Sequence, residues 1–208
     1  MRDYLAWHAQ YDDPDSGLSW RLRQVQTFIT EFLHSHRGPV RVVSACAGDG
    51  RDLLGVLAGR TDAERVQATL VEVHPALVAT ARAAAGAAGL TDVQVRAADA
   101  GATEAYTGAV PADLVLLVGI FGNITAADIQ NTIATVPQLC AAGATVIWSR
   151  APQGDGNVHV RQWFADHGCT ELDYAEGRSD DAVGLGRVRF TRDPVPLQPG
   201  RRLFTFVR

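Results

Sequence analysis

Small residues and two closely spaced glycines fill a short turn between an apolar run and a helix-like pattern. The turn reads Ser44-Ala45-Cys46-Ala47-Gly48-Asp49-Gly50. Because such small side chains leave the main chain accessible, its N–H groups and the start of the next helix can approach a ligand closely. The turn therefore predicts a binding site for a ligand that lies against the backbone.

A dinucleotide is one ligand that binds turns of this kind, and its fingerprint needs a third glycine three residues after the second. In this chain Gly48 and Gly50 are followed by Leu53 at that position. A leucine there is expected to push the helix away from a pyrophosphate. NAD or FAD is therefore a weaker match than a ligand without phosphates, and an NAD-dependent oxidoreductase is a less favoured alternative.

Two carboxylates follow at the ends of the next two strand-like segments. Glu72 lies at the C-terminal tip of the first of these segments, and Asp99 lies at the C-terminal tip of the second. In nucleoside-binding α/β folds, an acid at the position of Glu72 accepts hydrogen bonds from a ribose diol. An acid at the position of Asp99 can accept from an adenine amino group. Together with the glycine turn, the two acids predict an adenosine site without phosphate contacts.

Alternating strand-like and helix-like segments would position these residues. The strand-like segments are 40–45, 66–73, 93–98, 112–119 and 144–149, and the helix-like segments between them are 51–58, 75–89 and 126–142. Such alternation predicts an α/β fold with a mostly parallel sheet and helices on both faces. Apolar residues at helical spacing predict a preceding helix over 16–36, with Asp15 or Ser16 as its N-cap.

The alternation weakens in the last quarter of the chain. A helix is expected over 158–168, a strand over 170–176 and a last strand over 202–208. The segment between these two strands is rich in glycine, aspartate and arginine. We therefore expect an antiparallel, hairpin-like end to the sheet.

The order of these features resembles the class I S-adenosylmethionine-dependent methyltransferases over residues 40–150. Their first motif usually reads acid-x-Gly-x-Gly-x-Gly, and this chain has Ser44-x-Cys46-x-Gly48-x-Gly50. The chain thus departs from the family at the acid and at the first glycine. The resemblance implies that Glu72 binds the ribose, that Asp99 binds the adenine, and that Ser44 and backbone carbonyls hold the methionyl ammonium.

The resemblance also implies a Rossmann-like fold, S-adenosylmethionine as cofactor and a small-molecule acceptor. We expect a single methyltransferase domain over 1–208. It would consist of an N-terminal helical cap (1–37), a cofactor-binding core (38–150) and an antiparallel C-terminal part (151–208).

Candidates for the acceptor site lie beyond the ends of the fourth and fifth strands, where ligands of open α/β sheets bind. They are Phe121, Asn123, Trp148 and Arg150. Core packing is the alternative for both aromatic residues, a turn role for Asn123 and a solvated surface position for Arg150. An N-terminal aromatic group that would form a lid adds Tyr4, Trp7, His8 and Tyr11. Docking of a helix on the sheet is the alternative for this group. We consider His8, Tyr11 and Asn123 for catalysis, and Tyr4, Trp7, Phe121, Trp148 and Arg150 for acceptor binding.

Composition excludes several other functions. The formal net charge is −4, which disfavours nucleic acid and anionic membranes as partners. All 19 basic residues are arginine, so lysine-dependent chemistry such as Schiff-base formation is excluded. The three cysteines favour reduced thiols in the cytoplasm, and no spacing predicts a metal site.

Two hypotheses from different classes follow. The first is a methyltransferase acting on a small molecule. The second is a degenerate member that binds S-adenosylmethionine without transferring its methyl group, and the departures at Ser44 and Cys46 motivate it. The sequence leaves the oligomeric state open.

Overall fold

The computed structural model describes residues 11, 13–151, 157–177 and 183–207. Seven strands form a single sheet in the order β3-β2-β1-β4-β5-β7-β6. The first five are β1 (Val40–Ala45), β2 (Val66–Glu72), β3 (Val93–Ala97), β4 (Ala112–Leu117) and β5 (Cys140–Arg150). They run parallel to their neighbours, whereas β6 (Cys169–Glu176) and β7 (Gly184–Phe190) pair antiparallel.

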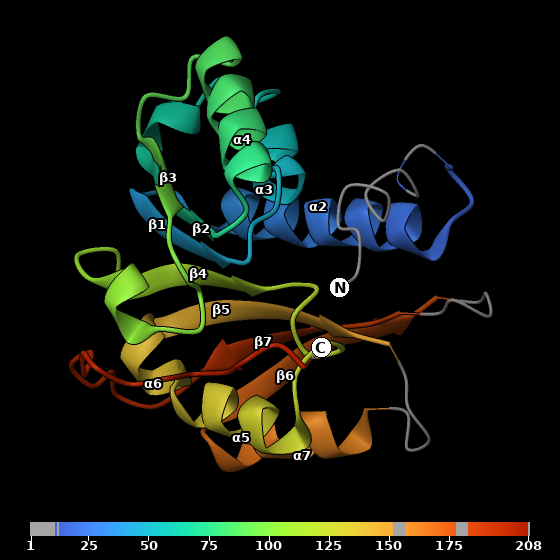
Figure 1. The fold of residues 1–208 in the computed structure, drawn as a ribbon, viewed down its shortest axis with the longest axis vertical. Coiled ribbons are helices and arrows are strands. Elements are labelled where there is room, and N and C mark those ends of the chain that lie inside the picture. Colours follow the sequence, from blue (N-terminus) through green and yellow to red (C-terminus); the bar gives the residue numbers. More distant parts are fainter. Residues whose placement is uncertain (1–10, 12, 152–156, 178–182, 208) are drawn as a thin grey trace.

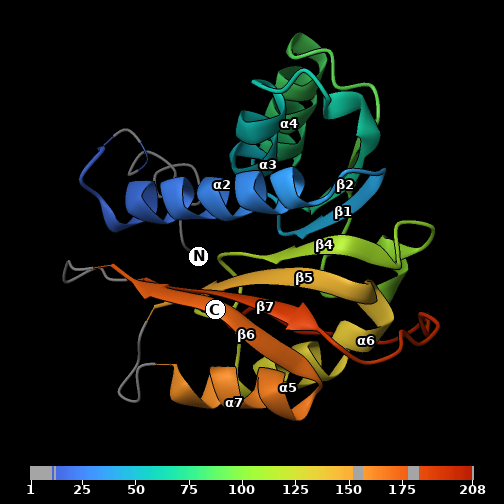
Figure 2. The same ribbon diagram turned by 180° about the vertical axis from the view of Figure 1, so that it is seen from behind.

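Helices cover both faces of this sheet, as the alternating segments predict. On one face lie α2 (Gly17–Ser35), α3 (Arg51–Leu57) and α4 (Pro75–Ala87), and on the other α5 (Ala126–Ala134), α6 (Val136–Leu139) and α7 (Val158–Asp166) (Figure 1). Seen from behind, α2 runs along the sheet between the α3–α4 pair and the C-terminal strands (Figure 2). Two short 3-10 helices, η2 (Ala63–Arg65) and η3 (Thr103–Tyr106), complete the connections.

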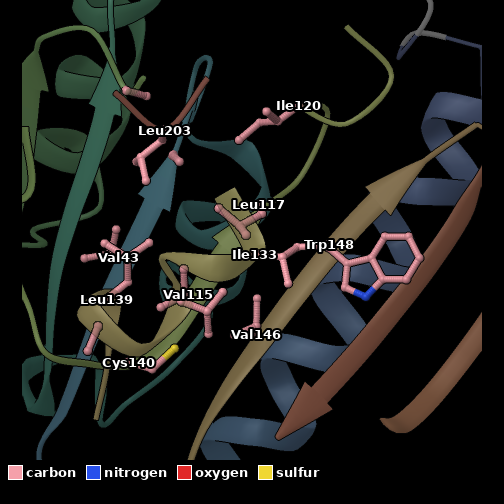
Figure 3. Packing of buried hydrophobic residues seen from close by; sticks show 14 of the residues in the cluster. Val43, Val115, Leu117, Ile120, Ile133, Leu139, Cys140, Val146, Trp148 and Leu203 are labelled. Atoms are coloured by element: carbon pink, nitrogen blue, oxygen red, sulfur yellow. The ribbon is translucent and has the colours of Figure 1, made fainter. Parts of the chain in front are cut away.

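The strands contribute side chains to two separate cores, because neighbouring residues of a strand point to opposite faces of the sheet. In β1, Val42 packs with the α2–α4 side and Val43 with the α5–α7 side. In β5, Ile147 belongs to the first core, whereas Val146 and Trp148 belong to the second. Figure 3 shows part of the second core: Val43 of β1, Val115 and Leu117 of β4 and Ile133 of α5 form one group, and the Trp148 indole of β5 lies to the right of it.

The N-terminal helix forms as predicted. The Ser16 side chain caps α2 by accepting a hydrogen bond from the Ser19 backbone N–H at 3.1 Å. Its apolar stripe, which includes Val25, Phe28 and Ile29, is buried against the sheet. The body of α2 is thus a layer of the fold.

Two predicted elements differ from the observed ones. The helix expected over 126–142 is split into α5 and α6, and β5 already begins at Cys140. Pro137 accounts for the break, because its ring clashes with the preceding turn and it has no N–H to donate.

The strand expected over 202–208 does not form in the described residues. Residues 202–207 make only isolated bridges, from Arg202 to Ala102 and from Phe206 to Ile124. The antiparallel partner of β6 is instead β7, inside the glycine-rich segment. Gly186 explains this composition, because a Cβ there would lie 2.3 Å from the Trp148 indole. The strand that pairs with β5 therefore needs glycine opposite Trp148.

Candidate functional site

A cavity of about 390 Å³ lies at the carboxyl ends of the first four strands. It is lined by Tyr11, Arg21, Cys46, Ala47, Gly48, Asp49, Arg51, Asp52, Glu72, Val73, His74, Pro75, Leu77, Asp99, Ala100, Val118, Gly119, Asn123 and Phe206. The volume is within the range of small-molecule sites, which is roughly 300–1,000 Å³. This is the edge of an open α/β sheet at which ligands bind.

The turn after β1 has left-handed backbone at every second residue. The φ angles of Cys46, Gly48 and Gly50 are 51°, 60° and 78°. The Ala47 N–H donates to the Val71 carbonyl oxygen at 2.9 Å and thereby continues the β1–β2 ladder beyond the strand. Gly48 and Gly50 adopt this conformation readily because they lack Cβ, whereas Cys46 does so at a cost of about 1–2 kcal/mol.

Glu72 joins the turn to the end of β2. Its Oε2 accepts from the Gly48 N–H at 2.9 Å, and its Oε1 accepts from the N–H groups of Val73 and His74 at 2.9 and 2.8 Å. The side chain is buried yet lines the cavity. A carboxylate has about four lone-pair positions, so these bonds leave Oε2 able to accept one further donor.

Asp99 lines the cavity after β3 but has a protein partner. Its Oδ2 accepts from both terminal nitrogens of Arg202, Nη1 at 2.9 Å and Nη2 at 2.8 Å, and its Oδ1 accepts from the Gly101 N–H at 2.8 Å. The Arg202 and Asp99 side chains are each about half exposed, at 52% and 51%. The C-terminal segment thus orients the acid that the sequence assigns to adenine.

The Cys46 thiol faces the same acids. Burial raises its pKa well above the ordinary value, and the charges of Glu72 and Asp99 raise it further. The thiolate is the nucleophilic form of cysteine, so Cys46 is unreactive at neutral pH.

Charged groups from α2 and the start of α3 surround Tyr11 in the cavity wall. Arg21 Nη2 donates to the Tyr11 hydroxyl, and the Arg51 guanidinium lies 4.2 Å from the Tyr11 ring centroid. Arg51 is itself held by Asp49, through Nε contacts of 3.0 and 2.9 Å to the two carboxylate oxygens.

The Tyr11 hydroxyl stays protonated at neutral pH. Burial raises its pKa, Arg21 lowers it, Asp52 raises it and Arg51 lowers it, with a net increase from the ordinary value. Tyr11 is therefore suited to donate a hydrogen bond and unsuited to act as a general base.

The cavity takes in some of the predicted residues and excludes others. Cys46, Gly48, Glu72, Asp99, Tyr11 and Asn123 line it, and the Asn123 amide donates to the Gly119 carbonyl oxygen at 2.9 Å. Ser44 does not, because it is buried in β1 between Leu70 of β2 and Leu116 of β4. Tyr4, Trp7 and His8 lie outside the described residues.

Gly50 also lies behind the cavity wall. A Cβ at Gly50 would lie 2.8 Å from Leu54 Cδ1 and 2.8 Å from Leu70 Cδ2. Leu53, at the position of the third glycine of a dinucleotide fingerprint, is buried in the core. Both positions therefore serve packing between α3 and β2.

The aromatic acceptor candidates belong to the core. Phe121 and Trp148 are 1% and 0% exposed, and their ring centroids are 6.1 Å apart. Trp148 also stacks on Phe164 of α7 at 5.7 Å and on Tyr174 of β6 at 6.0 Å. Arg150 donates to the Asn157 side chain at 3.2 Å and does not line the cavity. We therefore do not retain these three residues as acceptor contacts.

Sequence reasoning missed Arg21, Asp52 and Phe206 as cavity residues. Arg21 had a readable signal, because it follows Leu18 and precedes Val25 on the apolar stripe of α2, where a charged side chain is unusual. Phe206 had none, since its position depends on the path of residues 199–207.

The described residues contain no group of three or more histidine, cysteine or acidic side chains arranged to hold a metal ion. None of the described helices is long and apolar enough to cross a membrane.

No family model and no curated protein matches this sequence. Among solved structures, magnesium protoporphyrin IX methyltransferase from Synechocystis, with bound S-adenosylmethionine, is similar at a TM-score of 0.69. The two are 11% identical, and the similarity covers 90% of this chain and 91% of the other. A Burkholderia thailandensis 1,6-didemethyltoxoflavin N1-methyltransferase, with bound substrate and S-adenosylhomocysteine, has a TM-score of 0.66 at 16% identity, with coverage of 91% and 86%.

The chain has the class I methyltransferase fold. The predicted fold class is thereby confirmed, including the antiparallel end of the sheet. The [4+2]-cyclase SpnF is also similar, with a TM-score of 0.57, 15% identity and coverage of 80% and 81%. Proteins that share this fold are therefore named for different reactions, and the function has to be argued from the cavity.

Proposed function

We propose that this chain is an S-adenosylmethionine-dependent methyltransferase that acts on a small-molecule acceptor. The observation that carries the proposal is Glu72, a buried carboxylate that joins the glycine turn to the end of β2 and still faces the cavity. In a class I methyltransferase fold, this arrangement suits the ribose of an adenosine cofactor.

The other cavity residues fit the same cofactor. Glu72 Oε2 would accept a ribose hydroxyl, and Asp99, oriented by Arg202, would accept from the adenine amino group. Val73 is 66% exposed and lines the cavity beside Glu72, where it offers an apolar surface to a base. Gly48 brings the backbone of the turn close to the ligand.

S-adenosylmethionine supplies an electrophilic methyl group on a sulfonium, so the protein has to position the acceptor for in-line attack. Tyr11 and Asn123 face the cavity at its β4 side and would orient the acceptor. The raised pKa of Tyr11 favours a role as hydrogen-bond donor. A base is needed only for an acceptor that carries a proton on the attacking atom, and His8 stays a candidate for it.

A small acceptor agrees with the size and charge of the protein. The cavity of about 390 Å³ has room for compact ligands, and the net charge of −4 does not favour a nucleic-acid substrate.

Binding without methyl transfer is a second candidate function. Two observations favour it: Cys46 occupies the first-glycine position with a φ of 51°, and Ser44, at the position of the family's acid, is buried away from the cavity. A protein with these departures could hold the cofactor as a sensor.

Calorimetric titration tests the cofactor class. Wild-type protein is expected to bind S-adenosylmethionine and S-adenosylhomocysteine and not NAD. Glu72→Ala should lower the affinity for S-adenosylhomocysteine by about tenfold or more, because a hydrogen bond to a charged acceptor contributes roughly 1.5–3 kcal/mol. Glu171→Ala is the matched control, since Glu171 pairs with Arg161 away from the cavity. Unchanged affinity in folded Glu72→Ala would contradict the site.

Transfer is tested separately from binding. Protein, methyl-deuterated S-adenosylmethionine and a metabolite extract are incubated together and analysed by mass spectrometry. A deuterium-labelled small molecule that requires the protein supports the methyltransferase. Cofactor binding without any labelled product supports the binding protein instead.

A further inference from the structure

The charges of the cavity differ between its two ends. Asp99 follows β3 and Gly119 follows β4, at opposite ends of the strand order β3-β2-β1-β4. With neighbouring strands about 4.8 Å apart, these ends are separated by roughly 14 Å. The acids Glu72 and Asp99 belong to the β2 and β3 side. Arg21 belongs to the β4 side, because a Cβ built on Gly119 would lie 3.6 Å from its Nη1.

Arg21 of α2 and Asp52 of α3 carry opposite charges in the cavity wall near Tyr11. Both line the cavity, and both act on Tyr11: Arg21 donates to its hydroxyl and lowers its pKa, whereas Asp52 raises it. Arg21 is only 5% exposed. A guanidinium at a buried cavity wall attracts a carboxylate strongly, because its planar fork matches a carboxylate and little water screens the charges.

Other charged or polar groups nearby are less suited to a ligand. The Arg51 guanidinium is held by both carboxylate oxygens of Asp49 and stacks on Tyr11. Ser44, which the family resemblance places at the methionyl ammonium, does not reach the cavity. A cation and an anion that line one cavity and both act on Tyr11 are complementary to an α-amino-acid group, which carries one carboxylate and one ammonium.

We propose that Arg21 and Asp52 hold the amino-acid end of the cofactor, Arg21 its α-carboxylate and Asp52 its α-ammonium. This inference rests on the proposed function. It moves the recognition of the ammonium from the end of β1 to the start of α3, and it replaces the acid that the chain lacks at position 44. The adenosine end of the cofactor then lies toward Glu72 and Asp99.

The test compares two ligands that differ only at this end of the molecule. S-adenosylhomocysteine carries the amino-acid group, and 5′-methylthioadenosine has the same nucleoside and thioether without it. Arg21→Met should lower the affinity for S-adenosylhomocysteine about tenfold or more and change the affinity for 5′-methylthioadenosine by no more than about twofold. Calorimetry measures both affinities. Asp52→Asn should shift the ratio of the two affinities in the same direction.

Two variants serve as controls. Ser44→Ala should change neither affinity, because Ser44 lies behind the cavity wall. Arg187→Met removes another arginine that packs on α2, with its guanidinium 4.5 Å from the Phe28 ring centroid and a bond to Glu31. It should also leave both affinities unchanged. If Arg21→Met does not fold, Arg21→Lys and Asp52→Asn test the inference in its place. Arg21→Lys keeps the positive charge, and Asp52→Asn keeps the size of the side chain.

Several results would overturn the inference. They are unchanged S-adenosylhomocysteine affinity in the Arg21 and Asp52 variants, an equal loss of both ligands, or a selective loss of S-adenosylhomocysteine in Ser44→Ala. Wild-type protein that binds neither ligand would instead contradict the proposed function, so the two failures are distinguishable.

Discussion

At the ends of β2 and β3, polar side chains face a cavity, whereas at the end of β5, aromatic side chains face one another. Glu72 and Asp99 are both in the cavity wall. Trp148 on β5 is enclosed by Phe121, Phe164 and Tyr174. Both regions lie at the carboxyl edge of the sheet, so strand direction alone does not decide which residues meet a ligand.

The neighbouring strand explains the difference. The end of β5 pairs with β7, which continues the sheet antiparallel, and Gly186 of β7 lies directly opposite Trp148. The glycine leaves space that the indole fills, and α7 covers the cluster with Phe164. At the ends of β2 and β3, by contrast, no antiparallel strand in the described part of the chain covers the acids, and both Glu72 and Asp99 line the cavity. The antiparallel pairing of β7 with β5 therefore places the residues at the end of β5 in the hydrophobic core and not in a ligand site.

The largest expected effect is on the core side of this comparison. Trp148→Ala should lower the free energy of unfolding by about 3–5 kcal/mol, because it removes a fully buried indole. Urea unfolding measures the loss. Trp163→Ala, at a partly buried tryptophan on α7, should cost clearly less. A stable Trp148→Ala protein that no longer binds S-adenosylhomocysteine would show that Trp148 contributes to ligand binding and not to core packing.

The residues that the sequence placed correctly have local causes. β1 covers Val40–Ala45, as the apolar run predicts, and Glu72 reaches the cavity because it ends a strand that runs parallel to β1. The α2 cap at Ser16 is likewise set by neighbouring residues. Periodicity and strand order were sufficient for these features.

The features that the sequence did not reveal depend on contacts between distant segments. Asp99 is paired with Arg202, 103 residues away in the chain. The sequence did not predict β7, because its two glycines lower strand propensity: Gly186 lies against Trp148, and Gly184 lies against Asn157 and Tyr174. Arg21 enters the cavity only because α2 docks with this face toward Gly119. No pattern within a single segment contains these pairings.

The second effect concerns the glycine turn, where packing and ligand binding meet. Gly50→Ala should destabilise the protein by about 2–4 kcal/mol, because the added Cβ would overlap Leu54 and Leu70 at a positive φ. Thermal or urea unfolding measures it. Gly89→Ala is the matched control: its φ is 68° and no atom lies within 4 Å of the new Cβ, so only the backbone strain of about 1–2 kcal/mol applies. Equal losses at the two positions would mean that Gly50 does not contribute to packing.

The smallest expected effect is at Cys46, where the turn departs from the family pattern. A non-glycine residue at a φ of 51° carries strain that glycine does not, while glycine also gives the unfolded chain more freedom. Since the strain of about 1–2 kcal/mol equals or exceeds the entropic term of about 0.4–1 kcal/mol, Cys46→Gly should stabilise the protein by up to about 1.6 kcal/mol. Cys46→Ala keeps the Cβ and the strain but removes the thiol, so it should not show this gain. S-adenosylhomocysteine affinity should be retained in both variants, because the protonated thiol offers the ligand no charge. A loss of stability in Cys46→Gly would show that packing of the thiol outweighs the backbone strain. The turn would then be stabilised mainly by core packing, as Trp148 is at the end of β5, and not shaped mainly by ligand binding, as we infer for the ends of β2 and β3.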